Sequence, residues 1–204
     1  MALVHCHFFS QTLGRMTALS ALLPEPGQDC DPPDEPVRYP TLYLLHGLSD
    51  DHTVWLRRTS LERYLEGRRL AVVLPAAGRS FYTDALRGQR YWSFVSEELP
   101  RLARHLFPLS ARREENFAAG LSMGGYGAFK LALAHPERFA AAASLSGALD
   151  VARLVEEEQA AGTSELQDIF GPAERLAHSP DNLFHLAAQV LQVAAHKRAQ
   201  PLGV

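Results

Sequence analysis

The sequence lacks the features that mark a membrane protein, a secreted protein or a disulfide-stabilised protein. No apolar run approaches the roughly 20 residues that a membrane-spanning helix needs. The first ten residues have no Lys or Arg ahead of their apolar positions, unlike a signal peptide. Only two of the 204 residues are cysteines, Cys6 and Cys30; they could pair, but they do not form a disulfide framework. We therefore expect no membrane partner and a reducing, cytoplasmic compartment.

The sequence also has no excess or stripe of positive charge. Its formal net charge is −3, from 20 basic and 23 acidic residues, which argues against a nucleic-acid partner. Hydrophobic residues make up 47% and charged residues 21%, as in a globular protein with its own core. The length predicts a single domain over residues 1–204. The prolines between residues 24 and 40 predict a surface loop within that domain.

Short apolar segments alternate with helical patterns along most of the chain. Alternation at Val4, Cys6 and Phe8 predicts a strand that pairs with 15–23 across Gly14. Four short apolar runs are typical of buried parallel strands: residues 41–45, 70–74, 116–119 and 140–145. Helical spacing follows at residues 95–106, with Pro100 at a start or kink, at 123–135, and at about 182–197, before a tail to residue 204. This order predicts an α/β fold with a mostly parallel sheet and helices on both faces.

The segment Gly120-Leu121-Ser122-Met123-Gly124 matches the nucleophile elbow, G-x-S-x-G. In that turn a serine stands clear of the sheet, and the residues two before and two after it come too close together for side chains. Five letters match by chance in about 5–10% of chains this long. Here an apolar strand leads into the turn and a helix leaves it, which favours Ser122 as a catalytic nucleophile over a serine that only caps the helix.

A second motif, His46-Gly47-Leu48, follows the strand at residues 41–45. An oxyanion hole needs two backbone N–H groups aimed at the developing negative charge. In this fold one N–H comes from the residue after the nucleophile, here Met123, and the other from the loop after an earlier strand, which predicts Leu48. The alternative is a plain strand-to-helix turn. We expect the His46 ring to shape this loop and not to act as a base.

With these motifs the sequence resembles the esterase D-like branch of the α/β-hydrolases, which includes S-formylglutathione hydrolases, tributyrin esterases and mycolyltransferases. The resemblance runs from about residue 8 to residue 185 and rests on these stretches: Leu42-Tyr43-Leu44-Leu45-His46-Gly47-Leu48, Arg79-Ser80-Phe81-Tyr82-Thr83, Glu97-Glu98-Leu99-Pro100, Gly120-Leu121-Ser122-Met123-Gly124-Gly125-Tyr126-Gly127-Ala128, His135-Pro136-Glu137-Arg138-Phe139 and Ser146-Gly147. It implies hydrolysis of short-chain esters, with Trp55 and the Ser80–Thr83 loop near the acyl and alcohol pockets. An aromatic residue near a strand end is, however, more often part of the core.

The resembled family places its triad acid and histidine after the region of likeness. In this chain, residues 189–198 have the pattern of one more helix, so the last two strands of the family sheet have no counterpart and we expect a C-terminally truncated member. Asp150 could serve as the acid, with His178, His185 or His196 as the base. The favoured interpretation makes Asp150 a helix N-cap and the histidines surface residues.

We therefore expect a serine carboxylic-ester hydrolase that acts on small or short-chain acyl esters through an acyl-enzyme on Ser122. The alternatives are a non-catalytic remnant without a complete triad, and an acyltransferase on the same scaffold. No cofactor is implied, and His5 and His7 lack a third partner for a metal site. A small-molecule ester is the expected partner, and self-association stays open. Without a base the chain should be a poor catalyst, and the strand at 140–145 should be an exposed edge that the helix at 182–197 covers in part.

Overall fold

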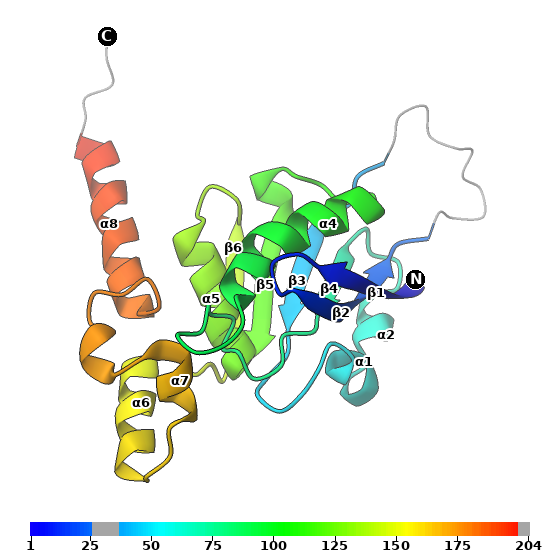
Figure 1. The fold of residues 1–204 in the computed structure, drawn as a ribbon. Coiled ribbons are helices and arrows are strands. Elements are labelled where there is room, and N and C mark those ends of the chain that lie inside the picture. Colours follow the sequence, from blue (N-terminus) through cyan, green and yellow to red (C-terminus); the bar gives the residue numbers. More distant parts are fainter. Residues whose placement is uncertain (26–36, 200–204) are drawn as a thin grey trace.

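The computed structural model describes residues 1–25 and 37–199, which form one six-stranded sheet flanked by helices (Figure 1). The strand order is β1-β2-β4-β3-β5-β6. The strands are β1 (Ala2–Ser10), β2 (Arg15–Leu23), β3 (Thr41–Leu45), β4 (Ala71–Pro75), β5 (Asn116–Leu121) and β6 (Ala141–Leu145). The helices are α1 (Val54–Arg58), α2 (Leu61–Leu65), α3 (Tyr91–Ser93), α4 (Leu99–Leu106), α5 (Met123–Ala134), α6 (Val151–Ala160), α7 (Glu165–Phe170) and α8 (Leu183–Ala199).

The sheet is parallel from β4 to β6 and antiparallel at its N-terminal edge. Strands β3, β4, β5 and β6 pair in parallel, whereas β1 pairs antiparallel with β2, and β2 antiparallel with β4. The β1–β2 hairpin turns at Gly14, whose φ of +63° favours glycine. The predicted mostly parallel α/β sheet is therefore confirmed.

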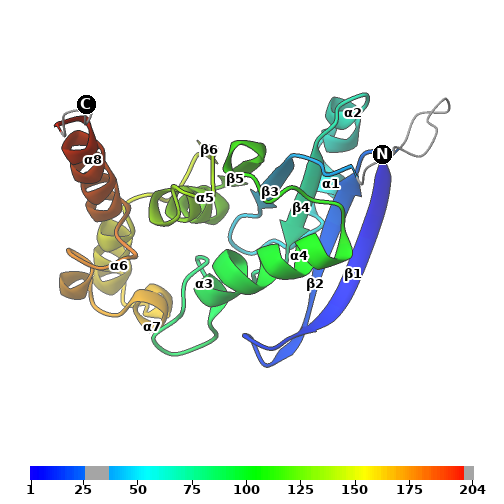
Figure 2. The same ribbon diagram turned by 90° about the horizontal axis from the view of Figure 1, so that it is seen from above.

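Alternation of side chains along β3 divides the core into two layers. Tyr43 and Leu45 point to the face that α4 and α5 cover, and Leu44 points to the opposite face, under α1 and α2. The view along the sheet in Figure 2 shows α4 on one side of β3 and β4, and α2 on the other. The expectation of helices on both faces is confirmed, and the turn after β5 lies one strand in from the β6 edge.

Pro100 sits near the start of α4, directly after a π-helical turn at Phe94–Glu98. Proline has no N–H, so it cannot donate to the carbonyl of Ser96 four residues earlier. The guanidinium of Arg138 donates to that carbonyl instead. The π turn and the arginine together show how the helical segment continues past a proline.

The carboxylate of Glu98 fastens the β1–β2 hairpin to the helical layer. It is 7% exposed, and it accepts the hydroxyl of Ser10 at 2.6 Å. It also accepts the backbone N–H groups of Gln11 at 2.8 Å and Thr12 at 3.0 Å. Three donors converge on one buried anion, and such charge-assisted bonds are stronger than neutral ones.

The C-terminal side of the sheet is open. β6 is the edge strand, and its outward positions are exposed. The described residues after it form no further strand. α8 packs against α5, and Leu183, Phe184 and Ala187 of α8 line a cavity together with Ala142 of β6; the expectation that this helix covers part of the edge stays a prediction. The predicted surface loop at 24–40 and any bond to Cys30 lie largely outside the described residues, as do residues 200–204.

Glu98→Gln should lower the free energy of unfolding by about 1–3 kcal/mol, because hydrogen bonds to a charged group are lost while their donors stay buried. Urea denaturation near neutral pH measures it. Glu97→Gln is the matched control: this neighbour is 64% exposed and pairs with Arg138, so its loss should cost less than about 1 kcal/mol. Equal losses in the two variants would contradict the role given to Glu98.

Candidate active site

Ser122 occupies a strained turn between β5 and α5. Its φ is +54° and its ψ −116°, a backbone conformation that costs a non-glycine residue about 1–3 kcal/mol. Backbone hydrogen bonds hold it there. Its N–H donates to the Leu145 carbonyl at 2.9 Å, and its carbonyl accepts the Ala148 N–H at 3.2 Å. The end of β6 therefore fixes the turn from the side.

The turn at Ser122 can close because the residues around it are glycines, which have no Cβ atom. A Cβ on Gly120 would collide with the backbone of Gly124, and a Cβ on Gly124 would collide with the carbonyl of Leu45. A Cβ on Gly125 would collide with the hydroxyl of Ser144. Because these collisions involve backbone or buried atoms, α5 can approach β3 and β5 only with glycine at these positions. The packing has the close approach that the motif predicts.

The Ser122 hydroxyl is not used to cap α5. Ser122 is the N-cap residue by position, but its side chain makes no capping hydrogen bond. Among the side chains that the structure describes, none hydrogen-bonds to this hydroxyl, and the residue is half-buried at the end of the sheet. The helix-capping interpretation of the serine is therefore wrong for its side chain.

The His46 ring orients the loop beside Ser122. Its Nδ1 donates to the Gly47 carbonyl at 2.7 Å, and its Nε2 accepts the Ala77 N–H at 3.0 Å. One ring nitrogen donates and the other accepts, so the ring is neutral. Burial lowers the pKa of His46, in agreement with a neutral ring. The structure gives His46 the loop-shaping role that the sequence predicts.

This arrangement decides the direction of the Leu48 N–H. In a trans peptide the C=O and N–H point opposite ways, so the Gly47 carbonyl at His46 turns the Leu48 N–H to the other side. A Cβ on Gly47 would lie 3.7 Å from the Ser122 Cβ. Leu48 lies in a turn and Met123 is the first residue of α5; among the described residues, neither N–H has a backbone partner.

The loop between β4 and α3 supports the site from its buried side. Ser80, Phe81, Tyr82 and Thr83 are all buried, and Trp55 donates its Nε1–H to the Leu45 carbonyl at 3.2 Å. This burial agrees with the core alternative, and a place in the acyl and alcohol pockets stays a prediction.

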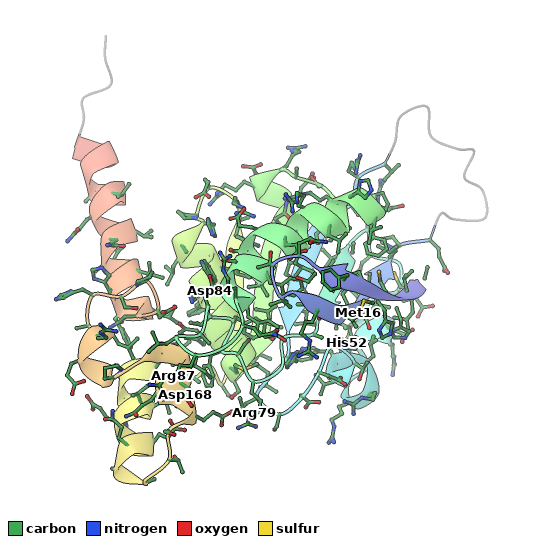
Figure 3. The ribbon with its side chains drawn as sticks, in the orientation of Figure 1. Met16, His52, Arg79, Asp84, Arg87 and Asp168 are labelled. Carbon is green, nitrogen blue, oxygen red and sulfur yellow. The ribbon has the colours of Figure 1, made fainter. Side chains whose placement is uncertain are left out.

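Helix α7 holds the outer part of the same loop. Arg79 bonds both carboxylate oxygens of Glu165, at 2.5 and 2.6 Å. Arg87 pairs with Asp168 at 3.5 Å, and Leu86 donates to a carbonyl of α7 at 2.9 Å. In Figure 3, Arg79, Arg87 and Asp168 lie close to one another beside α7. These links tie α7 to the loop after β4.

The structure does not bring Asp150, His178 or His185 to the Ser122 hydroxyl. Asp150 caps α6 by accepting the Arg153 N–H at 3.1 Å, as the favoured interpretation predicts. The His178 and His185 rings pack against each other, 5.5 Å apart, at the start of α8. The side chain of His196 lies outside the described residues.

Among the side chains that the structure describes, no three from His, Cys, Asp or Glu lie together as metal ligands would. No helix within residues 1–25 and 37–199 combines the length and the apolar character needed to cross a membrane.

The fold and the turn define the class of protein. A mostly parallel sheet with helices on both faces and a serine on a sharp strand-to-helix turn is the α/β-hydrolase arrangement. FphF, a fluorophosphonate-binding serine hydrolase of Staphylococcus aureus, has the same fold: its TM-score is 0.83, with 33% identity, covering 95% of this chain and 74% of its own.

The family whose description is "Putative esterase" matches residues 10–199. An acetyl esterase of Caldicellulosiruptor saccharolyticus is 33% identical over 157 residues, which are 76% of this chain and 59% of that enzyme. The S-formylglutathione hydrolase FrmB of Staphylococcus aureus gives a TM-score of 0.80 with 33% identity, covering 95% of this chain and 75% of its own. The chain belongs to this esterase family, in agreement with the esterase D-like motifs, and it spans 59% of the length of that acetyl esterase.

Acid should destabilise the protein through His46. Burial lowers its pKa below the ordinary 6.5, so between the two values the unfolded chain binds more protons than the folded chain. The contribution of the neutral ring to stability is therefore full above pH 6.5 and is lost as the pH falls through the folded pKa. His46→Gln removes the titration, so the difference in unfolding free energy between wild type and variant should shrink from about pH 7.5 to about pH 5.5.

Urea denaturation of both proteins at the two pH values measures this difference. His105→Gln, on the exposed side of α4, serves as the control. The unfolding free energy of this variant should stay close to that of wild type at both pH values. A His46→Gln difference that is constant or grows in acid would argue against a neutral ring in the folded protein.

Proposed function

We propose that the protein is a serine carboxylic-ester hydrolase that acts on small or short-chain acyl esters through an acyl-enzyme on Ser122. The observation that carries the proposal is the Ser122 turn itself: a strained serine whose hydroxyl makes no capping bond, next to a loop with an unused backbone N–H. Strain of this kind persists where surrounding contacts over-determine the backbone, and it clusters at active sites. The match to an acetyl esterase supports a short acyl group.

The reaction has two steps. The Ser122 oxygen attacks the acyl carbonyl, its bond to the acyl carbon forms, the bond to the leaving oxygen breaks, and the alcohol departs with the serine proton. Water then splits the acyl-serine, releasing the carboxylic acid and restoring the hydroxyl. Each step passes through a tetrahedral oxyanion. We assign its stabilisation to the N–H groups of Leu48 and Met123, because both lie next to Ser122 and neither has a backbone partner among the described residues.

A second candidate is a non-catalytic hydrolase that keeps the elbow. It is favoured by one observation: no side chain in the described part of the chain hydrogen-bonds to the Ser122 hydroxyl, so nothing there removes its proton. Without a base a serine hydroxyl is a weak nucleophile at neutral pH, and loss of a triad base can cost on the order of a millionfold in rate. Hydrolysis of 4-nitrophenyl acetate by the 204-residue chain decides between the two.

A fluorophosphonate probe should label wild-type protein at Ser122 and leave Ser122→Ala unlabelled, because the acylation chemistry is assigned to this one oxygen. Mass spectrometry of the labelled peptide identifies the modified residue. Ser49→Ala is the matched control, since Ser49 is also a serine with positive φ, +63°, and its variant should be labelled like wild type. Label on another serine would refute the assignment.

Leu48→Pro should lower the rate of ester hydrolysis by about 100- to 1,000-fold, because it removes one backbone donor of the oxyanion hole. Leu48→Ala keeps the N–H and should retain most of the activity. Steady-state rates with 4-nitrophenyl acetate compare the variants, after circular dichroism has shown that both are folded. If the two variants lose activity equally, the side chain and not the N–H of Leu48 matters.

A further inference from the structure

Two consecutive aromatic residues near the site adopt the left-handed backbone conformation. The φ angles of Phe81 and Tyr82 are +49° and +50°. Bulky residues rarely occupy this region, and two in succession need strong tertiary contacts to hold them. Both are buried, Phe81 to 4% exposure and Tyr82 to 0%.

The side chain of Tyr82 reaches the loop beside Ser122. Its hydroxyl donates to the His46 carbonyl at 2.9 Å. This carbonyl belongs to the peptide that joins His46 to Gly47, one residue before the peptide that carries the Leu48 N–H. Burial raises the pKa of Tyr82 well above its ordinary value, so the hydroxyl remains a donor at neutral pH.

The ring of Tyr82 also lies against the elbow helix. A Cβ on Gly127 would come within 2.5 Å of its Cδ2, so ring and helix backbone are in close contact. The neighbouring Phe81 N–H points at the Met123 Sδ, 3.3 Å away. The strained pair therefore contacts both halves of the assigned oxyanion hole, the His46–Leu48 loop and Met123.

We propose that the Tyr82 hydroxyl is a positioning group for the oxyanion hole: by holding the His46 carbonyl against the elbow helix, it sets the distance between the Leu48 N–H and the Met123 N–H. The inference rests on the proposed function, since an oxyanion forms only if Ser122 is acylated. His46 turns the Gly47–Leu48 peptide, and Tyr82 fixes the preceding peptide, so the loop is held at two successive points.

The positioning role predicts a defect in the transition state and not in binding. Tyr82→Phe keeps the ring on Gly127 and removes only the bond to the His46 carbonyl. The loop then gains freedom, and the Leu48 N–H is placed less accurately for an oxyanion that the bound ester does not yet carry. We expect kcat for 4-nitrophenyl acetate to fall roughly 10-fold, less than for loss of a whole donor, while KM changes by less than about twofold.

Tyr126→Phe is the matched control. Tyr126 is buried like Tyr82, and its hydroxyl donates to a backbone carbonyl at a similar distance, the Asp181 carbonyl at 2.8 Å. Its loss should lower the melting temperature as Tyr82→Phe does, yet leave kcat near the wild-type value. Rates are measured well below both melting temperatures, so that a folding defect does not enter.

Two readouts separate positioning from packing. The first is the rate at which a fluorophosphonate, whose phosphoryl oxygen needs the same donors, labels each variant. The second is the amide NMR spectrum, in which Tyr82→Phe should shift Gly47 and Leu48 whereas Tyr126→Phe should not. If Ser122→Ala is labelled like wild type, the proposed function fails and this inference fails with it. If labelling needs Ser122 but the two Tyr→Phe variants behave alike, only the positioning role of Tyr82 is overturned.

Discussion

The contact between the start of α5 and the end of β3 is the constraint on which the rest of the site depends. Gly124 lies so close to the Leu45 carbonyl that no side chain fits between them. This contact brings the residue after β5 next to the loop after β3, although the two are more than seventy residues apart in the chain. Ser122 and Gly47 become neighbours only because two backbones meet here, which requires glycine and forces a left-handed serine.

The surrounding polar groups act mainly on backbone atoms. The His46 ring donates from Nδ1 to the Gly47 carbonyl and accepts the Ala77 N–H at Nε2, and this pairing leaves no site for a second ring proton. The Tyr82 hydroxyl binds the carbonyl one peptide earlier. Backbone peptides thereby acquire fixed directions, which lets N–H dipoles stabilise charge without reorganising during the reaction.

Much of this could be predicted from the sequence. The alternating strands, the short apolar runs and the elbow motif depend on local patterns, and the structure confirms the sheet and the place of Ser122 within it. The left-handed Phe81–Tyr82 pair could not be predicted, because aromatic residues carry no local signal for positive φ and the contacts that hold the pair include bonds to the distant residues His46 and Met123. The bond from Arg138 to the Ser96 carbonyl could not be predicted either. Pro100 indicates only that a carbonyl four residues earlier lacks its usual backbone donor.

The position of the site in the sheet limits what the open edge can disturb. β5, which carries Ser122, is paired on one side with β3 and on the other with β6. The donors assigned to the oxyanion hole come from the loop after β3 and from the start of α5, and the residues that orient them come from the loop after β4. All of these lie on the inner side of β6, and α7 supports the loop after β4 from outside, through the pair of Arg79 with Glu165. Only the bond from the Ser122 N–H to the Leu145 carbonyl joins the nucleophile to the edge strand itself, and through that bond fraying of β6 would reach the site.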